Sequence, residues 1–336
     1  METTRNEHAG LLKKCSKNVS SLSILLIIYF LFSRFLSKIY LYICYTVMTG
    51  KITLSLDVLK DYFSDKQEML SSTVFQMTAD IVITVCSISV MLLVARLAFK
   101  TTVWSCFKVE KKGITTGFKW LAPCFVFNML ASTIISFFTG FLNQMGVDVP
   151  TADFSIRQPS VFAVIMQFAY VIIFAPLFEE IIYRGLILKA ISPYSKTAAV
   201  FVSALTFGLM HGNIPQAASA FCTGFLYAVI ALRCNSIIPT VIIHGINNLI
   251  VCSPDFADVL GLPYNGTVIS AVEICLALFG FFLWFTQYKF ILCYDDKPKD
   301  EQNKAVFRTV FKNPILIVYM CLLILTVIFR LIKANS

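Results

Sequence analysis

Uncharged apolar runs long enough to cross a lipid bilayer recur along this chain of 336 residues. A helix needs about 20 mostly apolar residues to cross the hydrocarbon core. Hydrophobic residues make up 57% of the sequence and charged residues only 14%, against about a quarter in soluble domains. Backbone polar groups inside lipid must be satisfied within the segment, and a helix does this. The sequence therefore predicts an all-α fold, a polytopic transmembrane helical bundle.

We expect about eight to nine spans. They cover residues 21–48, 77–95, 120–142, 160–191, 197–211, 216–232, 236–251, 267–288 and 315–332. The first is interrupted by Arg34 and Lys38, and a shorter span followed by an interfacial helix is an open alternative. We divide the chain into N-terminal spans (1–158), a central core (159–252) and C-terminal spans (253–336).

The basic residues predict the orientation of the bundle. Lys and Arg number four in 1–20, six in 96–119, three in 184–196 and six in 289–312, but one in 143–158 and none in 253–266. The positive-inside rule then places the N-terminus in the cytosol. The net charge of +9 is spread over these short loops, so we expect no nucleic-acid partner. The eleven cysteines form no C-x-x-C pair and favour buried apolar positions over a metal or disulfide framework.

The stretch 175–185 places Glu179, Glu180 and Arg184 inside an apolar run. Each ionisable group at bilayer depth costs about 2.5–3.5 kcal/mol on insertion scales. Glu180 and Arg184 are spaced i, i+4 and share a helix face, while Glu179 lies about 100° round. These groups either line a wet or mutually paired site or mark a helix end at the water interface. On this stretch alone both interpretations stand equally.

Two of the three histidines, His211 and His244, lie in later spans, and Asn248 shares a helix face with His244. A single histidine in an apolar helix is most often a packing residue. Two of them after an acidic pair favour a shared site, because intramembrane ionisable groups face the bundle interior. At 1.5 Å per residue, Glu179, His211 and His244 lie about 18, 21 and 12 Å from the cytosolic ends of their spans.

Three short motifs thus follow one another in the core: Glu179-Glu180-x-x-x-Arg184, Phe207-x-x-x-His211 and His244-x-x-x-Asn248. In this order they resemble the motifs of the CAAX-protease and bacteriocin-processing (CPBP, or Abi) family of intramembrane glutamic peptidases. The resemblance covers about residues 160–251 and implies a CAAX-protease-like core. Each motif alone is weak, whereas the three in register are specific.

The resemblance implies a role for each of these side chains in peptide-bond hydrolysis. Glu179 would be the general base on a water molecule, and His211 would orient that water or shuttle its proton. His244 and Asn248 would stabilise the oxyanion of the tetrahedral intermediate. Two adjacent carboxylates in a site of low dielectric constant do not both ionise cheaply, so we expect Glu180 to keep its charge beside Arg184.

Alternatives remain at this point. Glu and His are also zinc ligands, so a zinc site is the alternative to a mechanism without a cofactor, although no H-E-x-x-H motif is present. A non-catalytic immunity or peptide-binding protein of the same architecture is a second possible function. A proton-coupled transporter is a third, which the lack of a repeated span pattern disfavours.

We therefore expect an intramembrane endopeptidase whose partners are the lipid bilayer and a peptide or small-protein substrate. Short loops favour a prokaryotic cell membrane, and we expect substrate to reach the site from the cytosolic side. A prenylated substrate does not follow from the family resemblance.

Overall fold

The computed structural model describes residues 2–100, 103–108, 111–263, 266–292 and 300–336, and in these ranges it contains helices and loops without any strand. The all-α fold is therefore confirmed.

The first helices are α1 (Glu2–Thr49), α2 (Leu56–Ser64), α3 (Gln67–Ser71), α4 (Thr73–Phe99), η1 (Trp104–Phe107) and α5 (Lys111–Gln144). The core contains α6 (Val161–Gln167), η2 (Phe168–Phe174), α7 (Ala175–Glu180), η3 (Ile181–Leu188), α8 (Lys189–Ile191), α9 (Lys196–Leu209), α10 (Ile214–Cys234) and α11 (Ile238–Val259). The C-terminal helices are α12 (Gly266–Leu292), α13 (Asp300–Phe311) and α14 (Pro314–Ala334).

Six helical segments among the described residues are long and apolar enough to cross a bilayer: Asn6–Thr49, Thr73–Phe99, Gly117–Gln144, Val161–Ile191, Ile214–Cys234 and Pro314–Ala334. The chain is thus an integral membrane protein. The larger count of eight to nine spans stays a prediction, because α9 has only 14 residues and α11 carries several polar side chains. The first helix runs without a break through Arg34 and Lys38, so it is not a short span followed by a separate helix.

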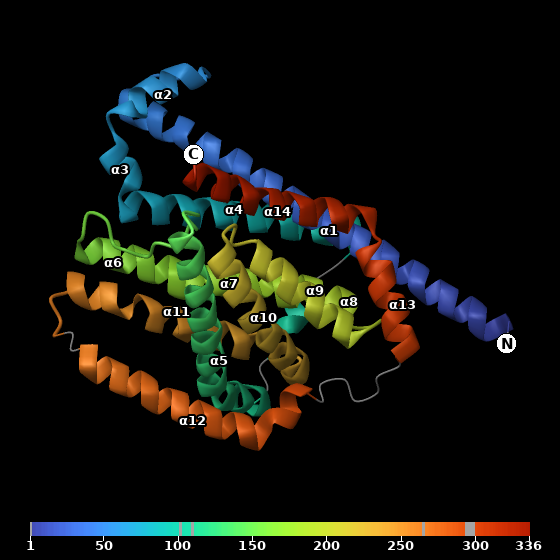
Figure 1. The fold of residues 1–336 in the computed structure, drawn as a ribbon. Coiled ribbons are helices and arrows are strands. Elements are labelled where there is room, and N and C mark those ends of the chain that lie inside the picture. Colours follow the sequence, from blue (N-terminus) through green and yellow to red (C-terminus); the bar gives the residue numbers. More distant parts are fainter. Residues whose placement is uncertain (1, 101–102, 109–110, 264–265, 293–299) are drawn as a thin grey trace.

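The long helices lie side by side in Figure 1, with α1, α4 and α14 in one layer and α9, α10 and α11 in the next. Helix α5 runs across this second layer and contacts α10, α11 and α12. Helix α13 lies across one end of the bundle, near the N-terminus of the chain, and the C-terminus lies at the other end. We call the end that carries α8, α13 and residues 103–108 the basic end, following the count of Lys and Arg above.

The segment from Val161 to Ile191 is one continuous helical rod with two wide stretches. Ser160 caps its N-terminus by accepting a hydrogen bond from Ala163 N–H. The two stretches η2 and η3 have π-helical geometry, in which each turn holds one residue more than an α-helical turn. They bracket the six residues of α7, which end in the two glutamates. π-Helical turns inside α-helices are frequent at functional sites.

Helices α9 and α10 form a tight hairpin whose turn carries one of the predicted site residues. The sequence predicted helix up to residue 211, but α9 ends at Leu209 and His211 lies in the turn. The side chain of Asn213 starts α10 by accepting a hydrogen bond of 2.9 Å from Gln216 N–H. A capping asparagine at this point competes with continued helix, which explains the earlier helix end.

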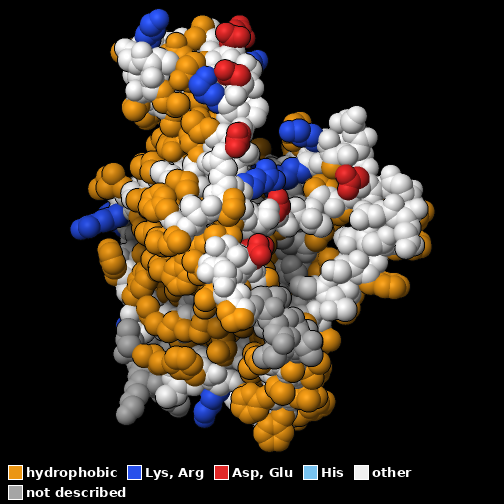
Figure 2. Space-filling model, turned by 90° about the vertical axis from the view of Figure 1, so that its left-hand side faces the viewer, with side chains coloured by type: hydrophobic (Ala, Val, Ile, Leu, Met, Phe, Trp, Pro, Cys, Tyr) orange, Lys and Arg blue, Asp and Glu red, His pale blue; other side chains and the backbone are white. Residues whose placement is uncertain are grey.

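The interior of the bundle is apolar and so is much of its outer surface. Buried side chains from α1, α4, η3, α9, α10 and α14 form one continuous core. Large hydrophobic side chains such as Phe137 (82% exposed) and Phe285 (73% exposed) face outward, as expected where lipid is the solvent. Figure 2 views the end opposite the basic end, and there hydrophobic side chains cover much of the surface, with charged ones mainly over α2 and α3 and in a central band.

Candidate active site

Glu180 and Arg184 form a fully buried ion pair. Arg184 Nη1 lies 2.9 Å from Glu180 Oε1, and both side chains have zero exposure. The i, i+4 spacing that the sequence indicated is therefore used for direct pairing. Arg184 Nη2 also donates a hydrogen bond of 3.0 Å to the carbonyl oxygen of Gly224. The interpretation that Arg184 marks a helix end at the water interface is wrong, since its side chain lies inside the protein.

Two aromatic rings enclose this guanidinium group. Arg184 Cζ lies 4.4 Å from the ring centre of Phe207 and 5.4 Å from that of Tyr227, which are favourable cation–π distances. Gly224 permits this close packing: a Cβ there would lie 2.7 Å from Phe207 Cδ1 and 3.3 Å from Arg184 Nη2. Helix α10 can therefore bring its backbone carbonyl to the arginine.

His244 bridges the two adjacent carboxylates. Its Nδ1 lies 3.3 Å from Glu180 Oε1 and its Nε2 lies 3.6 Å from Glu179 Oε2. A carboxylate can only accept, so Nδ1 donates to Glu180 and this fixes the ring orientation. The Glu180 side chain is fully buried, whereas that of Glu179 is 18% exposed. The two glutamates thus differ as the sequence suggested: one is paired and enclosed, and the other is partly open.

Asn248 lies one turn beyond His244 and binds the backbone of η2. Its Nδ2 donates a hydrogen bond of 2.9 Å to the carbonyl oxygen of Val171. In the π-helical register of this stretch, Ala175 N–H bonds to the carbonyl five residues earlier. The donor for Val171 would come from residue 176, which is a proline without an N–H. The amide of Asn248 therefore replaces the missing backbone donor and leaves its second N–H available.

The close approach of α11 to η2 depends on Gly245. A Cβ at this position would lie 2.7 Å from the carbonyl oxygen of Ile172, which is closer than real Cβ contacts. Small residues at such crossings let membrane helices pack backbone to backbone. The glycine between His244 and Asn248 in sequence therefore allows α11 to hold both side chains against the glutamate helix.

His211 lies in the turn after α9 with its ring fixed by the helix end. Its Nδ1 lies 2.9 Å from the carbonyl oxygen of Phe207 and 3.3 Å from that of Gly208. Because carbonyl groups accept hydrogen bonds, Nδ1 carries the hydrogen and Nε2 is the acceptor. The Phe207 ring lies between the two histidines, with centres 5.2 Å from the His211 ring and 5.7 Å from the His244 ring.

A cavity of about 220 Å³ joins these elements. Among its lining residues are His211, His244 and Asn248, which come from the second and third motifs. Glu179 reaches this group through His244, while Glu180 and Arg184 are enclosed behind it. The structure therefore joins Arg184, both glutamates and His244 by direct contacts, and it places His211 and Asn248 beside His244 around one cavity.

The cavity extends toward the end of the bundle opposite the basic end. From His244 it continues along α11 past Asn247 to Val251, and Phe154 from the loop after α5 also lines it. This loop lies at the end opposite the basic end, where Asn335 at the C-terminus binds Asp148. The expectation that substrate reaches the site from the cytosolic side stays a prediction. The spacing of the motifs in the sequence could not indicate the direction of the cavity. It gives only the depth of each side chain along its helix.

Two groups of site residues were not singled out by sequence reasoning. The Tyr227 ring lies beside that of His244 at a tilt of 39°, with ring centres 5.4 Å apart, and it also contacts Arg184. Asn128 from α5 donates a hydrogen bond of 3.1 Å to Asn247 Oδ1, and both amides line the cavity. An isolated Asn in the apolar run of α5 and a second Asn next to Asn248 were the available signals.

The described residues contain no group of three or more His, Cys, Asp or Glu side chains arranged to hold a metal ion. Glu179 and His244 approach each other, but the next neighbour of the histidine is Glu180, which already accepts from Arg184. Hydrogen bonds join Arg184, Glu180 and His244, and Glu179 lies 3.6 Å from the other nitrogen of His244.

Comparison with known families matches residues 161–250 to the family described as type II CAAX prenyl endopeptidase, Rce1-like. Comparisons with curated proteins and with solved structures gave no match. The matched range begins with α6 and ends within α11, so it contains the glutamate pair, both histidines of the cluster and Asn248. Over this core the chain is similar to the CAAX-type protease family that its three motifs resemble.

Proposed function

We propose that the chain is an intramembrane endopeptidase that hydrolyses a peptide bond with a water molecule activated by Glu179. The observation that carries this proposal is the position of His244 between the two glutamates, with Nε2 3.6 Å from Glu179 and Nδ1 3.3 Å from Glu180. This unit lies beside a cavity that His211 and Asn248 also line. The proposed orienting group and oxyanion donors thus line one cavity, and the proposed general base Glu179 approaches it through His244.

The reaction uses these residues in sequence. Glu179 takes a proton from water, and the resulting hydroxide adds to the carbonyl carbon of the substrate. His211, whose Nε2 is an acceptor, orients the water. Asn248 offers its second N–H to the oxyanion, and His244 offers Nε2–H when it is protonated at both nitrogens. Glu179 then returns the proton to the leaving amine as the carbon–nitrogen bond breaks.

Glu180 and Arg184 support the reaction from behind. Their buried ion pair keeps a negative charge next to His244 Nδ1, which holds the imidazole ring in place. A hydrogen bond to one ring nitrogen sets the role of the other. Glu180 is thus a positioning residue, and Glu179 is the carboxylate that faces substrate.

The substrate is a peptide or a protein segment on the outer side of a prokaryotic cell membrane. The basic end carries most of the Lys and Arg residues, so the positive-inside rule places it and the N-terminus in the cytosol. The cavity extends toward the other end, past Val251 and Phe154. This favours an exported peptide, or the external tail of a membrane protein, as substrate.

The orientation can be tested by thiol labelling in intact cells with a membrane-impermeant reagent. Thr151→Cys, in the loop after α5, should be labelled above the parent protein, whereas Lys304→Cys on α13 should be labelled only after the cells are opened. The reverse pattern would place the cavity on the cytosolic side.

Activity can be tested with protein purified in detergent and a peptide library. We expect cleavage by the wild type that chelator leaves unchanged, and a loss of about 100-fold or more in Glu179→Gln and His244→Ala. Glu301→Gln, at an exposed carboxylate on α13, should cleave normally. Cleavage abolished by chelator would favour zinc. Peptide binding without cleavage in the wild type, or full cleavage by Glu179→Gln, would contradict the proposal and favour a peptide-binding role.

A further inference from the structure

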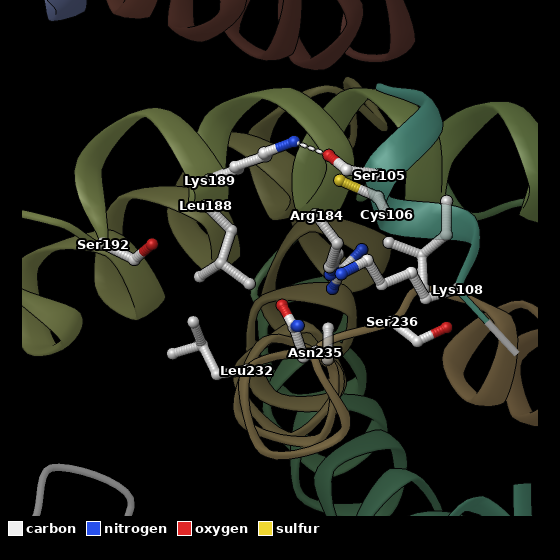
Figure 3. Close-up of a pocket in the computed structure, with 12 residues that line it drawn as sticks. Ser105, Cys106, Lys108, Arg184, Leu188, Lys189, Ser192, Leu232, Asn235 and Ser236 are labelled. Atoms are coloured by element: carbon white, nitrogen blue, oxygen red, sulfur yellow. Dashed lines mark hydrogen bonds between the residues drawn. The ribbon is translucent and has the colours of Figure 1, made fainter. Parts of the chain in front are cut away.

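A second polar pocket lies behind Arg184, at the basic end of the bundle. Its volume is about 140 Å³, and its polar lining includes Ser105, Lys108, Arg184, Lys189, Asn235 and Ser236. Figure 3 shows these side chains arranged around one space, with Arg184 and Lys108 extending toward each other. The pocket shares none of its lining residues with the cavity of His211, His244 and Asn248. It is therefore a separate site that meets the candidate active site only through Arg184.

The walls of this pocket are fixed by hydrogen bonds between three segments. The N–H of Ile237, at the start of α11, bonds to the carbonyl oxygen of Cys106 in η1 at 2.9 Å. Cys106 Sγ lies 3.6 Å from the carbonyl oxygen of Gly185 in η3. Lys189 Nζ donates to Ser105 Oγ. These contacts between neighbouring segments fix the positions of the residues that line the pocket.

The charges in the pocket all have the same sign among the described residues. Three cationic side chains line it, and no described carboxylate does. Like charges around one small space repel each other, and the repulsion grows where the local dielectric constant is low. Arg184 cannot leave, because its side chain is fully buried in its pair with Glu180. An anion in the pocket would relieve this repulsion.

Arg184 also has a buried donor without a partner. Nη1 and Nη2 bond to Glu180 and Gly224, but Nε has no hydrogen-bond partner and is shielded from solvent. A buried charged donor that lacks an acceptor costs free energy, and such a group in a native protein calls for an explanation such as an absent ion.

The carbonyl end of α10 reaches the same pocket and might be expected to repel an anion. Two carbonyls of its last turn already accept hydrogen bonds, however. The N–H of Asn235 bonds to the carbonyls of Ala231 and Leu232, and the N–H of Ser236 bonds to that of Ala231. The Asn235 amide and the Ser236 hydroxyl therefore remain as donors at this rim.

We propose that this pocket binds a phosphate group. Lysine and arginine together match its charge and its several acceptor oxygens, and the volume suffices for one tetrahedral oxyanion. The group comes either from the headgroup of an anionic lipid, because basic pockets between membrane helices bind such headgroups, or from phosphate free in solution. Since the anion and Glu180 share one guanidinium group, occupancy of the pocket is linked to the ion pair behind His244.

The test is phosphate-dependent thermal unfolding of purified protein in lipid-free detergent, at constant ionic strength set by chloride. The wild type should show a saturable rise in its melting midpoint. Lys108→Gln should weaken the apparent affinity about tenfold, because it removes one charge-assisted contact. Lys13→Gln makes the same charge change at an exposed position on α1 outside the pocket and should behave as the wild type.

A second arm distinguishes the two sources of phosphate. The same proteins are compared in micelles that contain phosphatidylglycerol or phosphatidylcholine, and retained lipid is measured by native mass spectrometry. If the protein retains phosphatidylglycerol and is stabilised by it but not by phosphatidylcholine, and if both effects require Lys108, the pocket binds a lipid headgroup. Stabilisation by inorganic phosphate alone assigns it to the free ion. No stabilisation by either, or equal stabilisation of Lys108→Gln, would overturn the proposal. None of these readouts depends on peptidase activity.

Discussion

Asn248 Nδ2 lies 2.9 Å from the carbonyl oxygen of Val171, 77 residues earlier in the chain. This bond joins α11 to the helix that carries both glutamates, at the point where Pro176 leaves a carbonyl without its backbone donor. The third motif thus stabilises an irregularity in the helix of the first motif. Its asparagine is both a cavity residue and a structural one.

This relationship predicts energetic coupling between Asn248 and Pro176. Asn248→Leu leaves the Val171 carbonyl unsatisfied and should cost about 1–3 kcal/mol of stability. In a Pro176→Ala background a backbone N–H is restored, so the same change should cost clearly less. A double-mutant cycle on unfolding in detergent measures the difference. Strictly additive effects of the two changes would contradict the assignment.

The buried ion pair predicts a strong effect of breaking one side only. Arg184→Met leaves Glu180 charged inside the protein and should cost about 3–5 kcal/mol. The matched control is Arg157→Met, which breaks an exposed i, i+4 pair with Asp153 and should cost less than about 1 kcal/mol.

Unfolding of the two variants under the same conditions gives the comparison. If Arg184→Met is as stable as Arg157→Met, the guanidinium group is not enclosed as described.

The two glutamates should respond differently to loss of charge. Glu179→Gln should abolish cleavage while the melting midpoint stays close to that of the wild type, because its side chain is partly open. Glu180→Gln should lower the melting midpoint, because Arg184 then lacks its counter-charge. Cleavage rates across pH and melting curves for both variants separate these outcomes. Equal, pH-independent losses of activity with equal stability would count against the division of roles.

Gly224 should tolerate no side chain. Gly224→Ala places a Cβ against Phe207 and Arg184, and we expect a cost of about 1–3 kcal/mol from overpacking. Gly140→Ala is the control, since Gly140 lies in α5 with nothing within 4 Å of an added Cβ. In a helix interior that change should stabilise by about 0.5–1 kcal/mol. Melting midpoints that move in the same direction for both variants would contradict this packing.

The sequence predicted the helical membrane bundle and the shared helix face of Glu180 and Arg184 because both rest on local rules. Apolar run length determines helices in lipid, and i, i+4 spacing determines which polar side chains share a face. It did not predict that α9 ends before His211, since the capping by Asn213 competes with an otherwise helical pattern.

Longer-range features were beyond such rules. The contact of Tyr227 with His244 and Arg184 depends on how α10 packs, and no spacing within α10 reveals its partners. The side on which the cavity opens depends on the path of α5 and on the loop that places Phe154. The sequence contains Pro176 within this helix, but the hydrogen bond by which Asn248 replaces the missing donor depends on the geometry of both helices.

The two wide stretches η2 and η3 also set how the protein responds to changes in length. Each residue rotates a helix by about 100°, and a stretch with an extra residue per turn can lose one and become an ordinary α-helix. A single deletion within Phe168–Phe174 would therefore leave the segment before it in nearly the same rotation relative to Glu179 and Glu180. A single deletion in the α-helical residues Ala175–Phe178 would instead turn that segment by about 100°. The orientation of the candidate site thus depends on where along residues 160–180 the chain changes in length, which no individual side chain reveals.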